Sequence, residues 1–258
     1  MRALSFIWLM VIGAAPAETS KLPPLNQYVL WAVNQMPKGG GYLASKKAIV
    51  NLQNGVALTD QGISTKPKVA SPSFCSGATY CVFLKVIDKL IEDGSLKMTG
   101  KQRWEFLKID EVPDGHGIWG RWNANGPGTA KLFAELKCGK NFTSYDHALP
   151  GDFMKIWWTE EIGGKERGHL VVYLGAIMKN GKKHIRFWSS NIPGGYGEKV
   201  VPQTNIKHVL FSRFENHRQL AKAGSLPEKN RFLEDMLRMS FTWKQVAKEC
   251  RVHATPGG

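Results

Sequence analysis

The pattern of apolar residues changes at Pro150-Gly151, and this change limits the folds open to the chain. Beyond it lie four short segments rich in β-branched and aromatic residues, as strands are: Asp152–Trp158, His169–Leu174, His184–Ser190 and His208–Phe214. An Asn-Gly pair within Lys179–Lys183 (KNGKK) separates the second segment from the third and is a strong signal for a tight hairpin. We therefore expect an antiparallel sheet in the C-terminal half.

The N-terminal half has helical periodicity instead. Residues 25–36 (LNQYVLWAVNQM) are amphipathic, and residues 75–91 carry apolar side chains at every fourth position. A shorter helix, with Thr129 as its cap, is predicted to run through Lys137, and the tail 227–250 is also predicted to be helical. Helices followed by an antiparallel run of strands predict an α+β fold.

The first 17 residues resemble a secretory signal. Met1-Arg2 gives a positive start, Ala3–Ala14 is apolar, and Ala15-Pro16-Ala17 offers the small residues that a signal peptidase requires. We expect cleavage after Ala17 and a secreted or periplasmic protein. No later stretch is long and apolar enough to predict a membrane span. Residues 18–258 are expected to form a single domain, with an insertion around 95–147 and a helical C-terminal tail.

The chain is strongly basic, with 35 Lys and Arg against 21 Asp and Glu and a formal net charge of +14. The basic residues are spread along the chain, and no nucleic-acid-binding motif accompanies them, so a nucleic-acid partner is not expected. For an exported protein the favoured partner is an anionic cell-wall polymer or a peptide substrate. A solvated basic surface without a specific partner is the alternative.

The cysteine and histidine spacings do not indicate a metal or cofactor site. The four cysteines, at positions 75, 81, 138 and 250, form no CxxC pair. His116, His147 and His184 show no metal-ligand spacing. No cofactor and no metal are therefore predicted. Export permits disulfides, and the sequence leaves the pairing of Cys81, Cys138 and Cys250 open.

Cys75 is the candidate nucleophile because it begins a predicted helix, in Pro72-Ser73-Phe74-Cys75-Ser76-Gly77. The positive end of the helix dipole and the unpaired amides there favour a thiolate, the reactive form. The backbone amides of Cys75 and Ser76 are the candidate oxyanion donors. A buried, inert cysteine is the alternative for this segment taken alone.

A thiol nucleophile needs a base and a group to orient that base. His169 begins a predicted strand, directly after Gly168. On the next strand, alternation places Ser189 and Asn191 on one face. Asn191 is the first candidate to orient the imidazole of His169, and Ser189 is the second.

These segments resemble the NlpC/P60 and CHAP families of papain-like cell-wall hydrolases. The resemblance rests on four motifs: Phe74-Cys75-Ser76-Gly77, Pro150-Gly151-Asp152-Phe153, GHLVVYLG at 168–175 and Trp188-Ser189-Ser190-Asn191. It covers roughly Ser71 to Asn191. Two positions differ from those families: Phe74 stands where NlpC/P60 enzymes usually carry an Asp that holds the substrate amine, and Ser189 replaces a CHAP Glu.

The resemblance implies a papain-like domain of the NlpC/P60 or CHAP type and an exported cysteine peptidase or amidase. Its implied substrate is an amide bond in peptidoglycan peptides, with Cys75 as nucleophile, His169 as base and a neutral group orienting the base. Two other functions stay open. One is a protease or acyltransferase that uses the same Cys-His site, and the other is a non-catalytic, basic domain that binds the cell envelope.

Overall fold

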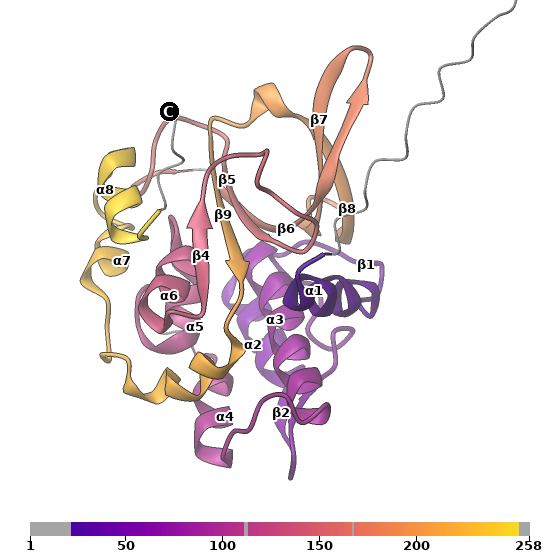
Figure 1. Cartoon of the computed structure of the whole chain (residues 1–258), viewed down its shortest axis with the longest axis vertical. Coiled ribbons are helices and arrows are strands. Elements are labelled where there is room, and N and C mark those ends of the chain that lie inside the picture. Colours follow the sequence, from indigo (N-terminus) through magenta and orange to yellow (C-terminus); the bar gives the residue numbers. More distant parts are fainter. Residues whose placement is uncertain (1–21, 111–112, 167, 253–258) are drawn as a thin grey trace, which may run out of the picture.

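The computed structural model describes residues 22–110, 113–166 and 168–252, so the predicted signal at 1–17 lies outside the described residues. Within them, seven strands form one sheet in the order β1-β8-β7-β6-β5-β9-β4, with antiparallel neighbours throughout. A separate two-stranded sheet pairs β2 with β3. Apart from the two-residue β1, the strands of the large sheet follow α1 to α6 along the chain, so the predicted α+β class is confirmed (Figure 1).

The elements have the following bounds. The helices are α1 (Pro24–Asn34), α2 (Lys46–Asn54), α3 (Cys75–Glu92), α4 (Gly100–Leu107), α5 (Gly117–Asn123), α6 (Gly128–Leu136), α7 (Arg231–Asp235) and α8 (Trp243–Glu249), with 3-10 segments η1 (Gln203–Asn205) and η2 (His217–Ser225). The strands are β1 (Gly39–Gly40), β2 (Val56–Leu58), β3 (Ile63–Thr65), β4 (Gly139–Phe142), β5 (Phe153–Trp157), β6 (Gly168–Lys179), β7 (Lys182–Asn191), β8 (Gly195–Pro202) and β9 (His208–Phe214).

Helix α3 is the central helix of the core. Its residues from Ser76 to Leu84 are all buried, and it packs against α1, β6 and β7. Alternation along the strands gives the sheet two apolar faces. One face packs on the cluster around α3 and includes Phe153, Val172 and Trp188. The residues next to them in the strands, such as Met154 and Phe187, belong to a second cluster with Phe211 on the other face. The start of α3, where Cys75 lies, is thereby fixed against the sheet.

The predicted hairpin is present between β6 and β7. Asn180 and Gly181 both have positive φ, 51° and 69°, as a two-residue turn of this kind requires. The register places Lys179 opposite Lys182. Figure 1 shows that this hairpin extends beyond the rest of the sheet.

Asp152 of the Pro-Gly-Asp motif has a structural role. It is fully buried, and its carboxylate accepts hydrogen bonds from the Arg213 guanidinium at 2.8 and 2.7 Å. The side-chain amide of Asn26 on α1 donates to the same carboxylate at 2.8 Å. A buried carboxylate needs such partners, and these connect α1 to β9.

The segment predicted as an insertion around 95–147 contributes α4, α5, α6 and β4, and its aromatic residues pack in the core. Trp122 is stacked on Phe83 of α3, with ring centroids 4.7 Å apart. Phe106 and Phe133 also contact the Phe83 ring. The predicted Thr129 cap is wrong: α6 begins after Pro127, and the Thr129 hydroxyl has no hydrogen-bond partner.

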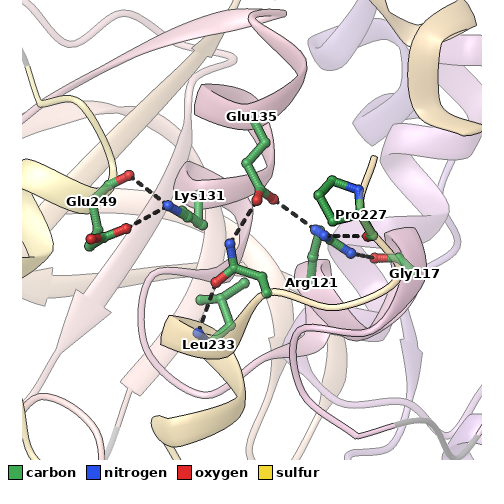
Figure 2. Close-up of polar contacts among 8 residues, drawn as sticks. Gly117, Arg121, Lys131, Glu135, Pro227, Leu233 and Glu249 are labelled. Atoms are coloured by element: carbon green, nitrogen blue, oxygen red, sulfur yellow. Dashed lines mark hydrogen bonds and ion pairs between the residues drawn. The ribbon is translucent and has the colours of Figure 1, made fainter. Parts of the chain in front are cut away.

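The tail 227–250, which was predicted to be helical, contains two short helices, α7 and α8, with non-helical chain between them. Figure 2 shows how polar contacts hold this tail. Glu135 accepts from the buried Arg121 guanidinium at 2.7 Å and from Asn230 at 2.7 Å, and Arg121 also donates to the Pro227 carbonyl at 2.8 Å. Lys131 pairs with Glu249 at 2.6 Å. The tail is thereby fastened to α5 and α6.

Among the helices in the described ranges, none combines the length and the apolar character needed to cross a membrane.

Candidate active site

The predicted site residues come from three neighbouring elements. Cys75 is the first residue of α3, His169 the second of β6 and Asn191 the last of β7. In the antiparallel register Val172 lies opposite Trp188. His169 comes three residues before Val172, and Asn191 comes three residues after Trp188. Continuing the antiparallel register therefore places His169 opposite Asn191.

His169 and Asn191 are joined by a hydrogen bond, with 3.1 Å between Nε2 and Oδ1. The Asn191 side-chain nitrogen donates to the carbonyls of Ser189 at 3.2 Å and Gly197 at 2.9 Å. Because a carbonyl can only accept, these two bonds fix the amide so that its oxygen faces the ring. His169 therefore carries its proton on Nε2, which leaves Nδ1 for the thiol.

Ser189, the second candidate for orienting the base, is hydrogen-bonded to the backbone instead. The Ser189 hydroxyl is buried and donates to the Leu170 carbonyl at 2.8 Å. The neighbouring Ser190 hydroxyl donates to the Ser73 carbonyl at 2.8 Å, which fastens the end of β7 to the segment before Cys75. The geometry thus favours Asn191 over Ser189 as the group that orients His169.

The Cys75 thiol has an unusual acidity. Burial acts to raise its pKa, but the hydrogen bond and charge of His169, the Leu170 amide and the charge of Lys155 lower the pKa to about 7. A thiol with this pKa is about half ionised at neutral pH.

The other three cysteines have the opposite character, although all four are free thiols. Burial raises the pKa of Cys81 and of Cys250 to about 12 and raises that of Cys138 further. Their side chains are buried, whereas Cys75 is partly exposed. Cys75 is therefore the one thiol of the chain with the acidity and access of a nucleophile.

The first turn of α3 supplies free amides beside this thiol. No side chain caps the helix at Phe74, and the first intrahelical bond runs from the Ala78 amide to the Phe74 carbonyl at 2.9 Å. The amides of Cys75, Ser76 and Gly77 therefore have no acceptor within the helix. Cys75 and Ser76, the predicted oxyanion donors, both line the adjacent cleft.

A cleft of about 490 Å³, here called the Cys75 cleft, opens at this point. Its walls come from the β1–α2 connection, from the start of α3, from α5 and α6, and from the β5–β6 region. The lining residues are Tyr42, Ala44, Phe74, Cys75, Ser76, Trp122, Asn123, Ala124, Asn125, Gly126, Gly128, Thr129, Lys155, Glu166, Gly168 and Leu170. Apart from the Cys75 thiolate, only Lys155 and Glu166 among these lining residues are charged at neutral pH.

Sequence reasoning missed the residues that support the start of α3. The Trp122 indole donates to the Ser76 carbonyl at 3.1 Å, and the Ser76 hydroxyl donates to the Asn123 side chain at 2.6 Å. It also missed Lys155 and Glu166. A lone Lys in the apolar strand Phe153–Trp157 was a usable signal for Lys155, whereas no local pattern marks Glu166.

The arrangement is suited to nucleophilic attack on a carbonyl. It offers an acidic thiol, an imidazole held by a neutral amide, and backbone N–H groups for a developing oxyanion. In the described residues, no group of three or more His, Cys, Asp or Glu side chains is arranged to hold a metal ion. Comparison with protein-family models, with curated proteins and with solved structures finds no match for this chain.

Proposed function

We propose that this protein is an exported cysteine hydrolase that cleaves amide bonds, with a papain-like fold of the NlpC/P60 or CHAP type. The observation that carries the proposal is the Cys75–His169–Asn191 arrangement, in which the thiol pKa is lowered to about 7 and Nε2 of the base lies 3.1 Å from the orienting amide oxygen. The order of the three residues along the chain matches that of the families it resembles.

The mechanism follows from these groups. The Cys75 thiolate attacks the carbonyl carbon, and the amides of Cys75 and Ser76 donate to the oxyanion. The His169 imidazolium protonates the departing amine, which leaves an acyl thioester on Cys75. His169 then takes a proton from water, the resulting hydroxide attacks the thioester, and the acid is released with the thiol restored. Asn191 keeps the imidazole aligned in both halves.

We propose peptidoglycan peptides as the substrate class. The support is the sequence resemblance, the predicted signal and the charge of +14, which suits an anionic polymer. The protruding β6–β7 hairpin carries Lys179, Lys182 and Lys183, with the exposed Met178 beside them. These cations lie at the far end of β7 from Asn191, and we infer that they contact the polymer beyond the cleft.

Phe74 is the observation that favours a second candidate, a protease or acyltransferase using the same site. It lines the Cys75 cleft with an apolar ring where the NlpC/P60 enzymes that the sequence resembles usually carry the Asp that holds a substrate amine. A free amine next to the scissile bond therefore has no carboxylate at this position.

Mass spectrometry of digests separates these candidates. Purified protein is incubated in parallel with cell-wall sacculi, with sacculi plus acceptor amines, and with a denatured protein mixture. Soluble stem-peptide fragments with new amine and carboxyl ends support the peptidoglycan assignment. Cleavage of the protein mixture alone, or amide formation with the added amines, would replace it with the second candidate. Binding to sacculi without any product would favour a non-catalytic envelope-binding domain.

A further inference from the structure

The two charged residues of the Cys75 cleft are not equivalent. Both carboxylate oxygens of Glu166 already accept two hydrogen bonds each. Oε1 accepts from Lys155 at 2.6 Å and from the Gly126 amide at 3.0 Å. Oε2 accepts from the Trp157 indole at 2.7 Å and from the Gly163 amide at 2.8 Å. Its side chain is 0% exposed. Glu166 therefore presents no free charge to a ligand.

Lys155 differs because its ammonium group has unused donors. It makes one ion pair, with Glu166, and lies over the Trp157 ring at 5.2 Å from the centroid. An ammonium has three N–H donors, and no other acceptor in the described ranges takes the remaining two. The side chain is 12% exposed and lines the cleft. It is thus a fixed cation that a ligand in the cleft can reach.

Gly168 leaves room for this ammonium against the backbone of β6. A Cβ at position 168 would overlap Lys155 Nζ and crowd Glu166 Oε1. Since Gly168 immediately precedes His169, the ammonium lies beside the backbone that carries the base. Its charge is also felt at the thiol, because Lys155 is among the groups that lower the pKa of Cys75.

We propose that Lys155 forms a subsite for a carboxylate on the substrate close to the scissile bond. This deepens the proposed function, on which it rests for the identity of the substrate. The two unused N–H donors of the Lys155 ammonium match the two oxygens of a carboxylate. A phosphate dianion would leave excess negative charge beside Glu166 and the Cys75 thiolate.

Alkylation of Cys75 tests the subsite without knowledge of the substrate. Iodoacetate carries a carboxylate and iodoacetamide is its neutral counterpart, so the ratio of their rates at Cys75 measures attraction for an anion. Lys155→Gln should lower this ratio by about three- to tenfold at low salt, because one charge at close range has been removed. Lys155→Arg should keep it, and Lys244→Gln, an exposed change on α8 outside the cleft lining, should leave it unchanged.

Two further measurements keep the test decisive. Because Lys155→Gln leaves Glu166 without its cation, the double variant Lys155→Gln/Glu166→Gln is measured as well, and the proposal expects the same loss of iodoacetate preference. An unchanged ratio in both variants would overturn the subsite. Acetate should protect Cys75 from iodoacetate in the wild type more than in Lys155→Gln, whereas protection by inorganic phosphate alone would contradict the carboxylate assignment.

Failure of the proposed function can be distinguished from failure of the subsite. If the alkylation ratio depends on Lys155 but no amide is cleaved, the subsite stands and the hydrolase proposal falls. If peptides are cleaved, the proposal expects those with a free carboxylate near the scissile bond to lose kcat/KM on Lys155→Gln relative to their carboxamide forms. Equal losses for both forms would overturn the subsite and leave the hydrolase intact.

Discussion

His169 Nε2 and Asn191 Oδ1 lie 3.1 Å apart across 22 residues of sequence. The pairing of β6 with β7 brings the two residues together, and the carbonyls of Ser189 and Gly197 hold the Asn191 amide in one orientation. The base is thus positioned by a sheet register and not by a loop. A site held in this way is preorganised, since the strands fix both partners before substrate arrives.

Cys75 should react with iodoacetamide in its thiolate form with a midpoint near pH 7. The folded pKa is lowered from its ordinary value to about 7, so the thiolate fraction rises through neutral pH instead of through pH 9. Cys81, Cys138 and Cys250 should stay unmodified, because burial raises the pKa of each. Peptide mapping of labelled protein from pH 5 to pH 9 measures this. A midpoint above pH 8.5 would contradict the proposed pairing with His169.

Asn191→Ala should lower the rate of amide cleavage by roughly tenfold or more, because the imidazole loses the group that holds its tautomer. The matched control is Ser189→Ala, which removes the hydroxyl bonded to the Leu170 carbonyl and should cost about 1 kcal/mol of stability with little change in the thiol midpoint. The two variants are compared by turnover, alkylation pH profile and urea unfolding. A larger loss of turnover in Ser189→Ala would reverse the assignment of the orienting residue.

Glu135→Ala should destabilise the protein by about 3 kcal/mol, because it leaves the buried Arg121 guanidinium without its carboxylate. Glu249→Ala removes the acid of the more exposed pair with Lys131 and should cost less than about 1 kcal/mol. Urea unfolding of both variants measures the difference. Equal losses of unfolding free energy in the two variants would contradict the stronger role assigned to the buried Arg121–Glu135 pair in holding the C-terminal tail (Figure 2).

Asp114→Asn should stabilise the protein near neutral pH by about 1–2 kcal/mol. Burial raises the pKa of Asp114 to about 6, so the folded state binds this proton more tightly than the unfolded chain does. That contribution is present below the unfolded pKa and is lost as pH rises through about 6. Thermal unfolding should therefore show the full gain for Asp114→Asn at pH 7.5, a smaller gain at pH 5, which lies above the unfolded pKa, and no gain near pH 3. A gain of the same size at pH 5 would contradict the shift.

Local pattern was enough to predict several elements. The strand predicted over His208–Phe214 has the same bounds in the structure, and the helix predicted from Cys75 ends one residue later than expected, at Glu92. Both have strong apolar periodicity and clear breakers. The Asn-Gly turn at 180–181 could also be predicted, because its backbone conformation depends on those two residues themselves.

Other parts depend on distant partners and escaped prediction. Strand β8 (Gly195–Pro202) contains Gly, Lys and Glu and lacks a clean alternation, and its pairing with β7 organises it. Trp122 supports the start of α3 from 46 residues away through its bond to Ser76. Lys155 could be recognised as a lone charge in an apolar strand. Its partner Glu166 lies in the loop between β5 and β6, so the ion pair could not be predicted from local sequence.

Replacement of the nucleophile tests the central claim most directly. Wild-type protein and Cys75→Ala are incubated at equal concentration with the same purified sacculi, and released peptides are quantified by mass spectrometry. We predict that wild type releases amide-cleavage products and that Cys75→Ala, with an unchanged unfolding midpoint, releases none above background. Cleavage by Cys75→Ala at the wild-type rate would contradict the assignment of Cys75 as the nucleophile.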